Sequence, residues 1–61
     1  MNTWYEVSII LEAENKKIHV VSTESLELAQ NKKQEFLEAG IKAIVEEWKI
    51  KNEEPILMGV I

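Results

Sequence analysis

His19, the only histidine of this chain, is the residue best suited to act as a general acid or base. A two-residue turn at Asn15-Lys16 would place Glu12 opposite His19 in a strand hairpin. A carboxylate that orients an imidazole is the first half of a general-base arrangement. The sequence places no nucleophile or oxyanion donor beside the two side chains, so we interpret them as a cross-strand polar pair.

The other common catalytic arrangements are missing from the sequence. The chain has no cysteine, which rules out disulfides and thiolate metal sites, and one histidine per chain is too few for a typical metal centre. Gly40 and Gly59 are isolated, so they form no loop that cradles a phosphate. Glu46 and Glu47 are neighbours in an expected strand and point to its opposite faces. We therefore predict no enzyme activity, no cofactor and no metal site.

The charged residues are of only two kinds, because all eleven acids are glutamate and all seven bases are lysine. Without arginine the chain lacks the bidentate fork that reads phosphates and guanine edges. Its net charge of −4 also argues against nucleic-acid binding. No apolar run approaches the roughly 20 residues of a membrane-spanning helix, and the first residues lack the basic region of a signal peptide. We expect one domain over residues 1–61, in the cytoplasm of a bacterial or phage-infected cell, with no nucleic-acid or membrane partner.

The stretch from Ser22 to Gly40 predicts one amphipathic helix. Its apolar side chains fall on one arc at the helical period, and they are Leu26, Ala29, Phe36 and Leu37. Ser22 is the expected N-cap, with Thr23 as the competing cap, and Val21 and Leu26 have the spacing of a hydrophobic staple. Gly40 is expected to close the helix in the left-handed conformation. Leu28 points away from the apolar arc and could extend a contact patch.

The segments on either side of this helix alternate as strands. We expect strands at residues 4–13, 17–21, 41–50 and 56–61. The predicted fold is α+β with the order ββαββ, an antiparallel sheet of strand order 2-1-3-4 and a helix packed on one face. In the first hairpin, the expected register places Ile10 opposite Val21 and Leu11 opposite Val20.

One helix covers only one face of such a sheet. The other face would carry two tryptophans and four β-branched residues, which are Trp4, Ile10, Val21, Ile44, Trp48 and Ile50. The outer face of a solitary antiparallel sheet should be mainly polar, and a contiguous apolar area usually marks an interface. Tryptophan is also over-represented among interface anchors.

The final strand, Ile56 to Ile61, strengthens this prediction. It carries no charged side chain, and we expect no proline or bulge that would prevent it from pairing with another chain. A four-residue turn at 52–55 would place Gly59 across from Trp48. From this strand we add Leu57, Met58 and Ile61 to the predicted interface.

The size of the chain favours a homodimer. A domain of 61 residues buries only roughly 60% of the surface that its unfolded chain exposes, so small domains often depend on a partner. We expect two-fold symmetry, with the uncovered face, the final strand or both at the interface. The alternative is a compact monomer in which the tail folds over that face.

No specific motif identifies a family. In its size, its lack of cysteine and its abundance of Lys, Glu, Asn and Ile, the chain resembles accessory proteins of phages and mobile elements in low-GC bacteria. Several such proteins are small homodimers that block a host enzyme or defence system, including inhibitors of CRISPR, Thoeris, Gabija and Hachiman defences. The resemblance implies no particular site residues.

We therefore predict a non-enzymatic protein-interaction module that acts as a homodimer and blocks a partner protein, as a phage-encoded inhibitor of a host enzyme or anti-phage defence system would. The first alternative is a small-ligand-binding or sequestering protein with a pocket at the dimer interface near Trp4 and Trp48. The second is a minor enzyme that uses His19 and Glu12.

Overall fold

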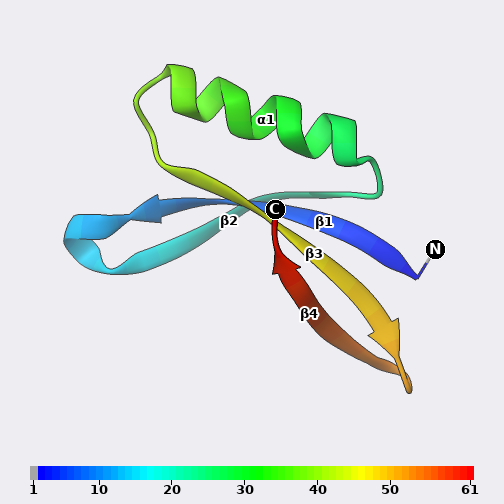
Figure 1. Ribbon diagram of the computed structural model, residues 1–61. Helices are drawn as coiled ribbons and strands as arrows, with labels where there is room; N and C mark the ends of the chain where they lie inside the picture. Colours follow the sequence, from blue (N-terminus) through cyan, green and yellow to red (C-terminus); the bar gives the residue numbers. More distant parts are fainter. Residues whose placement is uncertain (1) are drawn as a thin grey trace.

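The computed structural model describes residues 2–61, which form a four-stranded sheet with one helix packed on it (Figure 1). The elements, in order, are β1 (Thr3–Leu11), a short 3-10 helix η1 (Glu12–Glu14), β2 (Lys16–Thr23), α1 (Leu26–Glu38), β3 (Ala43–Lys51) and β4 (Glu54–Val60). Neighbouring strands are antiparallel, and the strand order is β2-β1-β3-β4. The predicted α+β fold and its strand order are confirmed.

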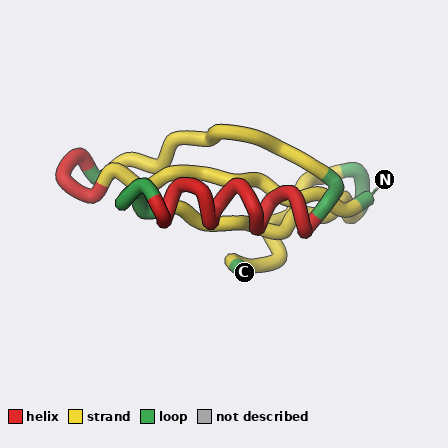
Figure 2. The backbone as a smooth tube through the Cα atoms, turned by 90° about the horizontal axis from the view of Figure 1, so that it is seen from above, coloured by secondary structure: helices red, strands yellow, loops and turns green. Residues whose placement is uncertain are grey.

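The helix α1 lies on one face of the sheet, where it contacts β1, β3 and β2. Figure 1 shows α1 above the sheet and the β3–β4 hairpin running away from it, and Figure 2 shows the helix beside the strands from above. The buried apolar side chains are Val7, Ala29, Ala43 and Val45, and the partly buried Tyr5, Val21 and Phe36 pack around them. Two of the four buried apolar side chains among residues 2–61 are alanines, so this core is small.

The N-cap of α1 is Ser25, and the prediction of Ser22 or Thr23 is wrong. Ser25 Oγ accepts a hydrogen bond from the Leu28 N–H at 3.1 Å, and Thr23 Oγ1 accepts one from the Ser25 N–H at 3.1 Å. The helix begins later than predicted because β2 stays paired with β1 up to Thr23. With Ser25 as the cap, Val21 does not hold the position that a hydrophobic staple requires.

The C-terminal end of α1 follows the prediction for Gly40. This glycine has a φ of 79°, in the left-handed region. The Ile41 N–H donates to the Phe36 carbonyl at 2.8 Å, and the Gly40 N–H donates to the Leu37 carbonyl at 3.0 Å. These two bonds form a Schellman motif, which satisfies carbonyl groups that the helix itself leaves unpaired.

The β1–β2 connection is not the predicted two-residue turn. Glu12–Glu14 form η1, and Asn15 takes the left-handed conformation with a φ of 54° before β2 begins. Ile10 pairs with Lys17, four residues away from its predicted partner Val21. A shift by an even number of residues leaves the side chains of Ile10 and its neighbours on their predicted faces, because the side-chain period of a strand is two.

Each outer strand carries one β-bulge, which the sequence does not reveal. On β2 the register shifts between Val7 and Ser8, which pair with Val21 and His19, so Val20 is the extra residue. Beyond this bulge, Val21 lies on the helix-covered face and packs against the core. The prediction that Val21 belongs to the uncovered face is therefore wrong.

On β4 the extra residue is Met58. Trp48 pairs with Leu57, and Gly59 pairs with the residue before Trp48, so the predicted pairing of Gly59 with Trp48 is wrong. No heavy atom lies within 4 Å of the position that a Cβ on Gly59 would occupy, so the Trp48 ring does not lie over it. The strand also contains Pro55, so the prediction of an edge without proline or bulge is wrong as well.

The β3–β4 turn has two residues in place of the predicted four. Asn52 and Glu53 have φ values of 51° and 66° and lie between the paired residues Lys51 and Glu54. Positive φ at both positions is typical of a type I′ turn, whose twist matches that of the flanking strands. At this turn β4 therefore begins two residues earlier than predicted, at Glu54, and β3 ends one residue later, at Lys51.

The molecule is less compact than is typical for a chain of its mass. Its principal extents are 37 × 25 × 15 Å, and its Cα radius of gyration is 12.0 Å. A compact domain of this length would have a radius of gyration of about 10.5 Å. The accessible surface is 4373 Å², compared with about 4,100 Å² for a typical folded monomer of this mass. The extended β3–β4 hairpin explains both differences.

The two glycines provide a matched test of the helix terminus. We expect Gly40→Ala to lower the free energy of unfolding by about 1 kcal/mol, because the left-handed conformation is strained for a residue with a Cβ. Gly59→Ala should be neutral or slightly stabilising, because Gly59 has no positive φ and open space around it. Urea unfolding monitored by circular dichroism measures both, and equal losses in the two variants would contradict the assignment.

Candidate functional site

The face of the sheet opposite α1, called here the open face, is built by alternation along the two central strands. The β1–β3 register pairs Trp4 with Trp48, Glu6 with Glu46 and Ser8 with Ile44. The residues of the open face are Trp4, Glu6, Ser8 and Ile10 of β1, Lys17, His19 and Ser22 of β2, Ile44, Glu46, Trp48 and Ile50 of β3, and Pro55, Leu57 and Val60 of β4. Except for Val21, the face residues of the predicted interface therefore lie on this one face of the sheet.

The two tryptophans form a stacked pair on the open face. Their ring centroids are 6.2 Å apart and their planes differ by 12°. An offset pair of this kind contributes about 0.5–1.5 kcal/mol beyond the area that it buries. Trp4 Nε1 donates a hydrogen bond to Glu6 Oε2 at 2.9 Å, whereas the buried Trp48 Nε1 has no acceptor among the described residues.

Next to the tryptophans, the middle of the open face is polar. Lys17 Nζ lies 3.0 Å from Glu46 Oε2 and donates to both carboxylate oxygens. Lys17 belongs to β2 and Glu46 to β3, so the lysine side chain crosses over β1, the strand that carries Ser8. Ser8 is 1% exposed and Glu46 is 4% exposed. The protein's own polar side chains therefore cover this part of the face.

The Lys17–Glu46 ion pair also resolves a charge conflict. Glu6 and Glu46 are directly opposite each other on β1 and β3, and like charges in such positions destabilise a sheet. Trp4 donates a hydrogen bond to the carboxylate of Glu6, and Lys17 forms an ion pair with that of Glu46. This bridge could not be predicted from the sequence, because the expected register of β2 placed Val21, and not Lys17, beside Ile10.

The predicted His19–Glu12 pair does not form. Glu12 lies in η1, and its Oε2 is 3.3 Å from Lys42 Nζ. His19 Nε2 instead lies 2.8 Å from Ser22 Oγ. Residues three apart point to opposite faces of a regular strand, so this contact depends on the extra residue Val20.

An imidazole beside a hydroxyl is the core of a base–nucleophile arrangement. His19 and Ser22 are both exposed, and no other side chain of residues 2–61 is hydrogen-bonded to the histidine ring. A catalytic histidine is normally oriented by such a third group. We interpret the contact as a polar link across the bulge.

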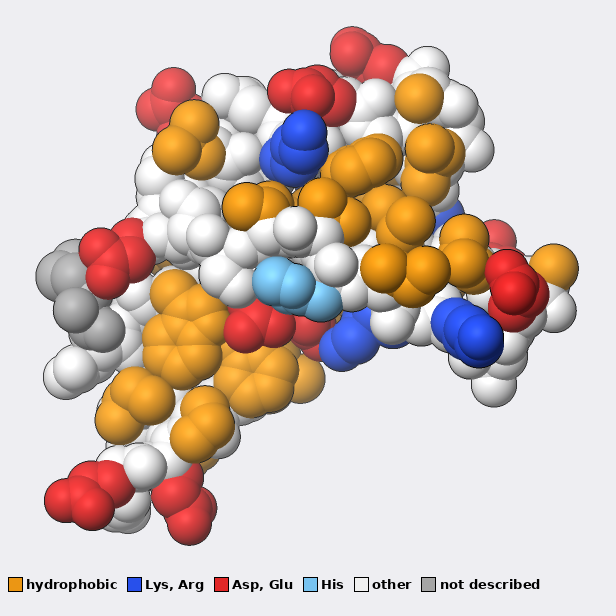
Figure 3. Space-filling model, turned by 180° about the vertical axis from the view of Figure 1, so that it is seen from behind, with side chains coloured by type: hydrophobic (Ala, Val, Ile, Leu, Met, Phe, Trp, Pro, Cys, Tyr) orange, Lys and Arg blue, Asp and Glu red, His pale blue; other side chains and the backbone are white. Residues whose placement is uncertain are grey.

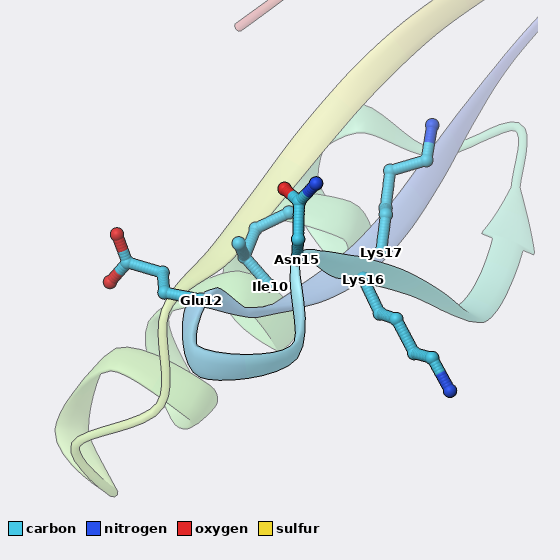
Figure 4. Close-up of a pocket in the computed structure, with 5 residues that line it drawn as sticks. All are labelled: Ile10, Glu12, Asn15, Lys16 and Lys17. Atoms are coloured by element: carbon cyan, nitrogen blue, oxygen red, sulfur yellow. The ribbon is translucent and has the colours of Figure 1, made fainter.

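The polar side chains that line the hollow at the β1–β2 hairpin do not point toward a common centre. It has a volume of about 340 Å³ and is lined by Ile10, Glu12, Asn15, Lys16 and Lys17. Figure 4 shows the lysine side chains on opposite sides of the ribbon and the glutamate turned away from both. Among the described residues, no group of histidine, aspartate or glutamate side chains is arranged to hold a metal ion.

Exposed apolar side chains continue along both faces of the β3–β4 hairpin. Ile50, Leu57 and Val60 lie on the open face, whereas Ile56, which pairs with Lys49, lies on the opposite face. Six aliphatic side chains of this hairpin and the residue after it are 38–61% exposed, and they are Ile50, Ile56, Leu57, Met58, Val60 and Ile61. Figure 3 shows hydrophobic side chains gathered over this hairpin beside the body of the molecule. We call this surface, together with Trp4 and Trp48, the hairpin patch. Ile10 and Ile44 lie on the other side of the polar Ser8–Glu46 region and outside this patch.

Comparisons with protein-family models, curated proteins and solved structures give no match to this chain. No helix in the described part of the chain is long and apolar enough to cross a membrane. The functional interpretation therefore rests on the surfaces described above.

The Lys17–Glu46 pair can be compared with the exposed Lys42–Glu12 pair. In a double-mutant cycle with Lys17→Met and Glu46→Gln, we expect a coupling energy of about 1–2 kcal/mol, because Glu46 is buried and needs its partner. The same substitutions at Lys42 and Glu12, whose side chains are 56% and 70% exposed, should couple by about 0–0.5 kcal/mol. Urea unfolding of the wild type and the six variants measures both values, and equal coupling would contradict the structural role of Lys17.

Proposed function

We propose that this protein is a non-enzymatic interaction module that acts as a homodimer and blocks a partner protein. The observation that carries the proposal is the hairpin patch, in which two stacked tryptophans adjoin six exposed aliphatic side chains. Exposed apolar areas of this kind mark interaction sites, and tryptophan is a frequent anchor in them. The polar groups of residues 2–61 do not converge on a reaction centre, which favours binding over catalysis.

The small core supports a dependence on a second chain. Two of its four buried apolar side chains are alanines, which contribute little burial free energy. A standard interface buries about 800 Å² per partner, with an apolar centre and a polar rim. Two copies related by a two-fold axis would each cover the patch of the other.

Side chains, and not the β4 edge, are the better candidates for this contact. Pro55 has no N–H to offer to a partner strand, and the bulge at Met58 interrupts the ladder. The aliphatic side chains on the same strand are exposed along its whole length. We therefore place the dimer contact on the face of the hairpin that carries Trp48, Ile50 and Leu57.

The small-ligand alternative needs a pocket beside the tryptophans. Neither the hollow in Figure 4 nor the groove between β2 and α1 includes Trp4 or Trp48. That alternative stays a prediction, and tryptophan fluorescence titrated with nucleotides and metabolites tests it.

Two isoleucines of equal exposure test the dimer contact. Ile50, at 40% exposed, belongs to the hairpin patch, whereas Ile18, at 42%, lies on β2 outside it. We expect the Tm of the wild-type protein to rise with protein concentration, because association stabilises the folded chain. Ile50→Glu should lower the Tm and remove this concentration dependence, and Ile18→Glu should retain it. A wild-type Tm that is independent of concentration would contradict the dimer.

The blocking activity is tested by binding to proteins of a bacterial lysate. We expect the immobilised wild-type protein to retain a host protein in stoichiometric amount and to reduce the activity of that protein. Failure to retain any protein, or retention without loss of its activity, would contradict the proposed role.

A further inference from the structure

The end of the β3–β4 hairpin projects beyond the part of the sheet that α1 covers (Figure 1). We call residues 49–57 the hairpin end, and all of them except Lys49 are exposed. The helix contacts β1, β2 and β3, whereas β4 packs on β3 and has few contacts, if any, with another element. The hairpin end therefore lacks a covering layer on both of its faces.

The hairpin end also lacks a third strand along most of its length. The pairing of β1 with β3 ends where Thr3 meets Lys49, and one further bond joins the Ile50 N–H to the Asn2 carbonyl at 2.9 Å. Beyond Ile50, β3 pairs only with β4. A two-stranded hairpin without a covered face is marginally stable at best in water.

The side chains of the hairpin end add little to its stability. Ile50 and Leu57 are 40% and 45% exposed on the open face, and Ile56 is 38% exposed on the opposite face. Among residues 2–61, no side-chain hydrogen bond or ion pair joins the hairpin end to another element. Few apolar contacts and exposed backbone hydrogen bonds are typical of segments that open at a low cost in free energy.

The base of the hairpin, in contrast, is fixed to the rest of the sheet. Val45 and Glu46 are buried, and Trp48 is stacked on Trp4 of the neighbouring strand. We use the term body for β1, β2, α1 and the part of β3 up to Trp48. The boundary between the body and the hairpin end therefore falls directly after Trp48.

The turn of the hairpin end has an unfavourable residue at its second position. Asn52 and Glu53 have φ values of 51° and 66°. Asparagine tolerates the left-handed conformation, and a type I′ turn normally has glycine after it. The Cβ of Glu53 strains this conformation, so the turn favours opening of the hairpin end.

We propose that the hairpin end is a separate folding unit, which opens in the single chain while the body stays folded and closes when a second copy covers its open face. The second part rests on the proposed function, because the dimer contact includes Ile50 and Leu57. Each chain then orders its own hairpin end as the dimer forms, and the cost of this ordering weakens the affinity of the dimer. The complete hairpin patch is therefore present only in the associated protein.

Hydrogen–deuterium exchange detected by mass spectrometry tests the separate unit. Below the Kd of the dimer, we expect the backbone amides of the hairpin end, corrected for intrinsic rates, to exchange at least about tenfold faster than the hydrogen-bonded amides of β1. Above this Kd, exchange of the hairpin end should slow by about tenfold or more, because association favours the closed form.

Two substitutions of Glu53, which lies outside the hairpin patch, test the link to the dimer. Glu53→Gly removes the strain in the turn, and Glu53→Gln removes the same charge but keeps the Cβ. We expect Glu53→Gly to lower the Kd of the dimer, measured by sedimentation equilibrium, by about threefold or more, and Glu53→Gln to change it by less than about twofold. If the hairpin end were already closed in the single chain, glycine would stabilise both states equally and leave the Kd unchanged.

Equal protection of the hairpin end and of β1 in the dilute protein would overturn the separate unit, whether or not a dimer forms. An unchanged Kd in Glu53→Gly would overturn the link between closing and association. A wild-type chain that stays single at every concentration would refute the dimer and this link. The exchange experiment on that single chain still decides the separate unit, so the two failures are distinguishable.

Discussion

The architecture depends on one constraint, which is that a single helix covers only one face of a four-stranded sheet. The helix α1 has 13 residues, and Ala29 is its only fully buried residue. It covers Val7 and Val45 of the sheet and leaves the β3–β4 hairpin outside the core. The open face therefore has two regions. Lys17 covers the polar region, and the apolar region remains exposed.

The two β-bulges decide where these regions lie. The bulge at Val20 moves Val21 from the open face into the core and brings His19 beside Ser22. The bulge at Met58 interrupts the outer edge of the sheet on the hairpin. Bulges increase local twist, which suits a sheet whose hairpin diverges from the helix-covered body. In the middle of the open face, Ser8 and Glu46 are buried, although no second layer covers this face.

The order of the elements could be predicted from the sequence because the side-chain periods of strand and helix differ, and because Gly40 marks the end of α1. The stacking of Trp4 on Trp48 follows from the same alternation. The registers of the outer strands could not be predicted, because a bulge inserts one residue without any distinctive residue type. The turn at Asn52 and Glu53 was missed because its second position is normally glycine.

The errors at the candidate site have the same cause. The observed register of β2 differs from the predicted one. His19 therefore contacts Ser22 instead of Glu12, and Lys17 donates to Glu46. None of these contacts has a signal in the sequence other than the register itself. The apolar character of the hairpin patch could be predicted, because it depends on composition and on alternation along β3, which has no bulge against β1.

The central claim is that the hairpin patch is covered by a second copy of the chain. Sedimentation equilibrium of the wild-type protein at micromolar concentration tests it most directly. The account predicts a mass of twice the 7.1 kDa of one chain. A single species with the mass of one chain across the micromolar range, with Trp4 and Trp48 accessible to a quencher in solution, would contradict it.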